Sequence, residues 1–99
     1  MNPQQVRRER LRQLTDLPNI GESMAADLCL IGIHTPQQLA GKDPFELYEH
    51  LCDVTQVHQD PCVLDTFLSI VSFVDGGPAL PWWNFTAIRK QALQARGES

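Results

Sequence analysis

The residues of this chain best suited to binding chemistry lie around Gly21, in the stretch LPNIGESMAADL at positions 17–28. Pro18 prevents a helix from simply continuing through this point, and Gly21 can adopt the positive φ of a tight reversal. A helix that starts at Glu22 leaves its first N–H groups without intrahelical acceptors. Free N–H groups at a helix N-terminus form a local anion site. The stretch therefore predicts a turn able to hold an anion such as a phosphate.

The same stretch has a second interpretation, in which the turn only joins two packed helices. In both interpretations Leu17 and Ile20 are buried to hold the two helices together. Glu22 follows the glycine directly, and a carboxylate near a bound phosphate opposes binding by an amount on the order of 1 kcal/mol. Both interpretations stay open on the residues alone.

Cysteine and histidine residues are a second group with possible chemistry. Cys52, His58 and Cys62 lie close together in the sequence and are of types that bind zinc. The possible fourth ligands are His50, His34 and Cys29. The spacing matches no common zinc pattern, so buried structural cysteines are the better interpretation, and we expect no metal or cofactor. The helix dipole favours a Cys62 thiolate whereas the Asp60 carboxylate opposes it, so we expect Cys62 to serve packing.

Aromatic side chains are a third group. Trp82 and Trp83 could stack on unpaired bases, because aromatic faces bind them without regard to sequence. Neighbouring side chains on an extended linker point in different directions, so we expect one tryptophan buried and the other partly exposed. The sequence contains no Gly-rich phosphate loop and no Ser nucleophile elbow, and we expect no enzymatic activity.

Charge is distributed unevenly along the 99 residues, whose net charge is −4 at pH 7. A dedicated nucleic-acid binder usually carries a basic surface, because neutralising phosphates supplies most of its affinity. Between Gln13 and Ile88 the only basic residue is Lys42. The other lysines and arginines lie towards the two ends: Arg7, Arg8, Arg10, Arg12, Arg89, Lys90 and Arg96.

Length and composition suit one domain, residues 1–99, with an ordered core over about 3–95. No apolar run approaches the roughly 20 residues of a membrane span, and the N-terminus lacks the apolar region of a signal peptide. Three cysteines are an odd number without a disulfide pattern. We therefore expect a cytoplasmic protein without membrane contact.

The elements that must position these residues are helices. Asn2 and Pro3 predict a helix from 3 to about 14, residues 22–31 form a second closed by Gly32, and Thr35 caps a short one. Asp-Pro pairs at 43–44 and 60–61 begin two more helices, and a last one covers about 87–95. The helix that begins at Pro61 is apolar over so much of its circumference that we expect it at the centre. The predicted fold is all-α, a compact bundle of about five helices plus a short one.

Several motifs carry a family resemblance. The first resembles the helix-hairpin-helix motif, a SAM-like unit that holds one DNA backbone phosphate without reading bases. It consists of Leu-Pro-x-Ile-Gly, three residues, Ala, two residues, Leu and then GIHTPQQL. Together with DPFELYEHLC, DPCVLD, PWWNFT and RKQ, the pattern resembles the small bacterial family called pathogenicity-locus or mitomycin-resistance proteins, over about residues 14–91. The layout is also similar to the C-terminal domain of bacterial competence regulators.

The resemblance implies which residues would contact DNA. The main-chain donors of Asn19, Ile20 and Gly21 would hold the phosphate, with Ser23 as a possible hydroxyl donor. Asn19 stands where such hairpins commonly have a first glycine.

Positive charge would come from the preceding helix. Arg8 and Arg12, four residues apart on one face of that helix, would supply it beside the hairpin. The implied function is weak, sequence-independent binding of double-stranded DNA in a repair, uptake or stress setting. The alternative is a protein–protein interaction module without DNA contact. The residues leave open the pathway, the choice between DNA and RNA, and the oligomeric state.

Overall fold

Two Asp-Pro pairs begin the two longest helices of the protein, as the sequence predicts. In the computed structural model, which describes residues 1–95 and 97, the side chains of Asp43 and Asp60 accept the N–H groups of Phe45 and Cys62 at 2.9 and 2.8 Å. Proline occupies the first helical position after each aspartate, where its missing N–H costs nothing. The resulting helices are α2 (Pro44–Thr55) and α3 (Pro61–Val74).

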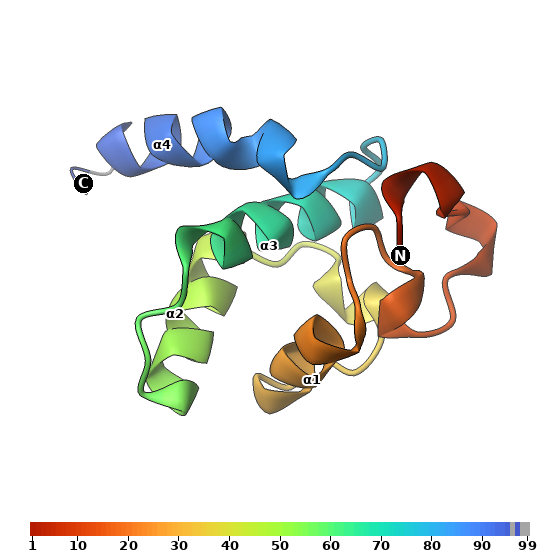
Figure 1. The fold of residues 1–99 in the computed structure, drawn as a ribbon, viewed down its shortest axis with the longest axis horizontal. Helices are drawn as coiled ribbons and strands as arrows, with labels where there is room; N and C mark the ends of the chain where they lie inside the picture. The colour runs from red at the N-terminus through yellow and green to blue at the C-terminus, as the bar shows by residue number, and fades with distance from the viewer. Residues whose placement is uncertain (96, 98–99) are drawn as a thin grey trace.

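The helix α3 lies at the centre of the molecule (Figure 1), as its apolar circumference predicts. Eight of its residues are buried, and Phe67 and Ile70 have no exposed surface. It contacts α2, α4 (Thr86–Ala95) and two single-turn 3-10 helices, η4 (Pro36–Leu39) and η5 (Trp82–Phe85). The remaining helix, α1 (Glu22–Leu30), packs against α2 and is followed by Gly32, which has a φ of +85°.

The all-α class is confirmed: the described residues contain four α-helices and no strand. The expected count of about five helices is wrong, because residues 3–14 do not form a continuous helix. They form two single 3-10 turns, η1 (Pro3–Gln5) and η2 (Arg8–Arg10), with extended residues between them, and η3 (Leu14–Asp16) follows. Tertiary contacts override the helix propensity of this segment, since Val6 and Leu11 both pack against the core.

The region before α4 also differs from the sequence prediction. The expected extended linker contains the turn η5, and α4 begins at Thr86, one residue before the expected start. The Thr86 hydroxyl donates to the buried carboxylate of Asp65 at 2.8 Å. Of the residues after the expected ordered core, only Gly97 is among those that the structure describes. Within the described part, no helix is long and apolar enough to span a bilayer.

Candidate anion-binding site

The 17–21 loop joins η3 to α1 and is built on buried apolar side chains. Leu17, Pro18 and Ile20 are almost completely buried, which confirms that Leu17 and Ile20 hold the neighbouring elements together. The element before the loop is one 3-10 turn and not a helix. The buried side chains therefore anchor the loop backbone to the core. Gly21, at the outer edge of the loop, is exposed.

The positive φ expected at Gly21 is wrong. Gly21 has φ −97° and ψ −172°, which is extended backbone, whereas Asn19 has φ +68°. Asparagine is among the residues that adopt the left-handed region most readily, because its side chain can compensate with hydrogen bonds. Here the Asn19 amide donates to Ser69 Oγ at 3.0 Å and to the carbonyl of Leu80 at 2.9 Å. Asn19 thus makes the reversal and ties the loop to α3 and to the segment before η5.

Two of the three predicted main-chain donors are engaged within the protein. The N–H of Asn19 donates to the carbonyl of Met1 at 2.7 Å, and the N–H of Ile20 donates to the carbonyl of Leu17 at 3.4 Å. The Met1 amine donates in turn to the carbonyls of Leu17 and Ile20, at 2.9 and 2.7 Å. Burial lowers the pKa of this amine. The start of the chain therefore covers the inner part of the loop.

The outer part of the loop keeps its donors. Among the described residues no acceptor takes the N–H of Gly21 or those of the first three residues of α1. A Cβ placed on Gly21 would meet no atom within 4 Å, so the space in front of this N–H is open. Ser23 is exposed on the same first turn. Of the predicted site residues, Gly21 and Ser23 are therefore accessible to a ligand.

The two predicted supporting arginines have separate environments. Arg8 donates to the carbonyls of Phe73 and Gly77, and its guanidinium lies 4.1 Å from the centre of the Phe73 ring. It fastens the N-terminal segment to the end of α3. Arg12 is exposed, and without a helix over 3–14 it shares no helix face with Arg8. Only Arg12 of this pair is available for a ligand.

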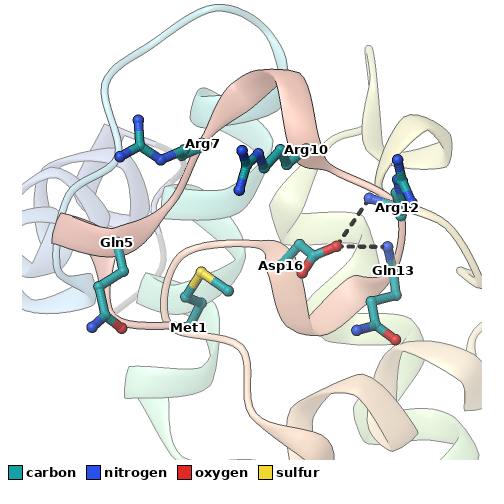
Figure 2. Close-up of a pocket in the computed structure, with 7 residues that line it drawn as sticks. All are labelled: Met1, Gln5, Arg7, Arg10, Arg12, Gln13 and Asp16. Carbon is teal, nitrogen blue, oxygen red and sulfur yellow. Dashed lines mark hydrogen bonds between the residues drawn. The ribbon is translucent and has the colours of Figure 1, made fainter.

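Three arginines instead line an open cavity of about 900 Å³ beside the loop (Figure 2). They are Arg7, Arg10 and Arg12, and the remaining lining residues are Met1, Gln5, Gln13 and Asp16. Among the described residues, none of these three guanidinium groups takes part in a hydrogen bond or ion pair. The turn η2 and its extended neighbours place them together, so the failure of the predicted helix creates the cluster.

Among the residues that the structure describes, Asp16 is the one carboxylate that lines this cavity. Its Oδ2 accepts the main-chain N–H groups of Arg12 and Gln13 at 3.0 and 3.1 Å, the two contacts drawn in Figure 2. These main-chain hydrogen bonds, the one from Arg12 first, lower the pKa of Asp16. Asp16 thus closes the turn η3, and three arginine charges face a single carboxylate in the cavity.

The cysteine and histidine residues form no comparable site. Within the described part of the chain, no group of three or more potential ligands could hold a metal ion. Cys52 Sγ accepts the N–H of Gln59 at 3.5 Å and lines a small cavity of about 310 Å³ with Tyr48 and His58. Hydrogen bonding to Asp60 raises the pKa of the Cys62 thiol, which disfavours a nucleophilic thiolate there.

Sequence reasoning missed Arg7 and Arg10 as site residues. Their signal was present, because four arginines crowd positions 7–12 of an otherwise acidic chain. On an ideal helix these residues would point in several directions, and only the observed path of the backbone brings three of them to one cavity.

The fold and this cavity define a small all-helical protein with a cationic cavity formed by its N-terminal segment. The chain belongs to the family described as pathogenicity locus, whose model matches residues 7–91. It is 44% identical over 84 residues to the mitomycin resistance protein McrB of Streptomyces lavendulae, covering 85% of this chain and 80% of that protein. No solved structure matches the chain.

Proposed function

We propose that the protein binds the sugar–phosphate backbone of DNA without reading its bases. The observation that carries this proposal is that Arg7, Arg10 and Arg12 line one cavity beside the 17–21 loop. Guanidinium groups match phosphate geometry and stay charged at any working pH. Three guanidinium groups without a hydrogen bond or ion pair among the described residues disfavour stability, because like charges repel, but they suit an anion with several phosphates.

The loop adds neutral donors to this charge. The free N–H of Gly21 lies close to the arginine cavity, since Gly21 lines a groove that shares Met1 with that cavity. We propose that residues 14–30 act as a helix-hairpin-helix unit whose first helix is reduced to the turn η3. In this unit Gly21 and Ser23 contact a phosphate, whereas Asn19 and Ile20 shape the loop.

The family supplies a setting for this activity. The Streptomyces lavendulae relative is named for resistance to mitomycin. We propose that this chain likewise acts under chemical stress, as a DNA-bound factor in repair. The net charge of −4 keeps the affinity low, so we expect dissociation constants at or above the nonspecific range of about 10⁻⁴–10⁻⁶ M at physiological salt.

The decisive experiment measures fluorescence anisotropy of a labelled duplex at several salt concentrations. The variant Arg7→Gln/Arg10→Gln/Arg12→Gln is compared with Lys42→Gln/Lys90→Gln, which neutralises two exposed cations elsewhere. We expect the arginine variant to bind at least about tenfold more weakly at low salt and to lose up to about 3 units of the log–log salt slope. The lysine variant keeps both values close to those of the unchanged protein.

A matched pair at Gly21 tests the loop. Gly21→Ala places a methyl group in open space at an ordinary φ, so it should leave both folding and DNA binding intact. Gly21→Asp also fits, but its carboxylate would cap the free N–H groups of α1 and repel a phosphate. We therefore expect Gly21→Asp to weaken binding without loss of helical content in circular dichroism.

The alternative function, a protein-interaction module, makes opposite predictions in the same assays. Duplex binding would be undetectable at protein concentrations on the order of a millimolar, well above the nonspecific range. Equal behaviour of the arginine and lysine variants would likewise reject the DNA proposal.

A further inference from the structure

A second groove, of about 810 Å³, shares the lining residue Met1 with the arginine cavity. It is lined by residues 1–4, by Asn19 and Gly21 of the loop, and by a wall of residues 79–83 that includes Trp82 and Trp83. This volume exceeds what one nucleobase requires and falls in the usual range of ligand sites.

The two tryptophans form a corner in this groove. The centroids of their rings lie 5.6 Å apart and the ring planes are inclined by 83°, so the two rings form an edge-to-face pair. Trp82 is half-buried and Trp83 is 61% exposed, so the expectation that one of them is buried is wrong. An exposed indole next to a perpendicular one leaves a flat face open to a planar guest.

The wall that carries these rings is held in place. Phe85, at the end of η5, is buried, and Asn84 donates from its N–H to the carbonyl of Pro81 at 3.1 Å. The Leu80 carbonyl accepts both the Asn19 amide and the Ser69 hydroxyl, at 2.9 and 3.0 Å. The groove is therefore connected by hydrogen bonds to the loop that carries Gly21.

Charge decides what fits the groove. No carboxylate lines it among the described residues, and the Met1 residue that it shares with the arginine cavity joins the two sites. A nucleic-acid strand presents this combination of groups: planar bases beside regularly spaced anions. A strand whose phosphates lie on the arginines could direct a base towards Trp83, provided that the base is not already paired within a duplex.

We propose that this groove receives an unpaired DNA base stacked on Trp83, so that the protein prefers single-stranded or gapped DNA to intact duplex. The inference rests on the proposed function, because the arginine cavity must hold the adjoining phosphates. It adds a substrate class: DNA in which at least one base has lost its partner.

The test compares an oligothymidylate of about 20 nucleotides with a duplex of the same length at low salt. Binding is followed by anisotropy of the labelled DNA and by quenching of intrinsic tryptophan fluorescence. The variants are Trp83→Ala and Trp83→Phe, and Ile88→Ala, which truncates an exposed residue of α4, serves as the control. Because Trp83 is mostly exposed, we expect every variant to keep its helical content, and Trp82 remains as a reporter.

We expect the unchanged protein to bind the single strand more tightly than the duplex. Trp83→Ala should weaken single-strand binding by about 5- to 150-fold while leaving duplex binding unchanged, and Trp83→Phe should restore most of the loss. If Trp83→Ala binds the single strand as tightly as the unchanged protein does, and duplex binding is intact, the groove proposal is overturned and the proposed function stands. Failure of both DNAs to bind overturns both, and a uniform loss for both DNAs in Trp83→Ala also rejects a base-stacking role.

Discussion

The guanidinium Nε of Arg89 donates to the Asp65 Oδ1 at 2.6 Å and joins α4 to the central helix α3. Asp65 is 1% exposed and also accepts the Thr86 hydroxyl, so its charge is held entirely by residues at the start of α4. A buried ion pair of this kind contributes little when it replaces a good apolar contact, but removing one partner leaves an uncompensated buried charge.

Loss of Arg89 should therefore destabilise the whole fold. We expect Arg89→Ala to reduce the free energy of unfolding by about 3 kcal/mol, which corresponds to a fall in Tm of about 10 °C or more for a chain of this size. Lys90→Ala removes the next, exposed cation and should change stability by less than about 0.5 kcal/mol. Urea unfolding followed by circular dichroism measures both; equal stability of the two variants would contradict the role given to the ion pair.

Asn19 should respond differently to alanine and to glycine. Alanine removes both side-chain hydrogen bonds and keeps a Cβ at a φ of +68°, so we expect a loss of about 2–3 kcal/mol. Glycine removes the same hydrogen bonds but has no Cβ, and Asn19→Gly should be more stable than Asn19→Ala by about 1 kcal/mol. Thermal unfolding of the two variants gives the difference, with Gly21→Ala as a neutral loop control; the reverse order would show that backbone strain is not the cause.

Tyr48 should titrate at unusually high pH. Burial raises its pKa to about 12, and its hydroxyl donates to the carbonyl of Gln59. The folded protein thus holds this proton more tightly than the unfolded chain, whose tyrosine pKa is about 10. The associated stability is complete below pH about 10 and is lost as the pH rises towards 12.

Tyr48 is the single tyrosine of the chain, so its ionisation can be followed directly by ultraviolet absorbance. We expect a midpoint well above the ordinary value in the folded protein and a normal one in denaturant. Tyr48→Phe should remove this part of the alkaline loss of stability. A midpoint near 10 before unfolding would contradict the structure.

The Cys62 thiol should become more reactive when Asp60 loses its charge. Hydrogen bonding to the Asp60 carboxylate raises the pKa of Cys62, whereas an asparagine there would still cap α3. In a Cys29→Ser/Cys52→Ser background, we expect Asp60→Asn to shift the pH profile of alkylation to lower pH. The reaction with a thiol reagent is followed by mass spectrometry, and an unchanged or higher midpoint would reject this assignment.

Local signals explain why α2 and α3 could be predicted from the sequence. An Asp-Pro cap and an apolar stripe act within a few residues, and both helices begin at the predicted proline. The segment over 3–14 could not be predicted in this way. Its path depends on Arg8 meeting two carbonyls more than 60 positions away, and helix propensity carries no information about such a contact.

The candidate site shows the same division between local and distant causes. The burial of Leu17 and Ile20 followed from the loop pattern, and so did the accessible donors near Gly21. The arginine cavity did not, because its residues converge only when the predicted helix is absent. The left-handed residue was assigned to glycine from propensity alone, whereas Asn19 takes it with help from Ser69 and Leu80.

The contacts of Met1 and Arg8 also bear on which changes of length the protein tolerates. Between these two attachment points the backbone crosses from the 17–21 loop to the end of α3 with only one hydrogen-bonded turn. Inserting or deleting a residue there would move Met1 or Arg7 relative to the loop, although no side chain had changed. Conversely, exchanges of the exposed side chains of Gln4 and Gln5 should leave that geometry intact, so at these two positions the number of residues matters more than their identity.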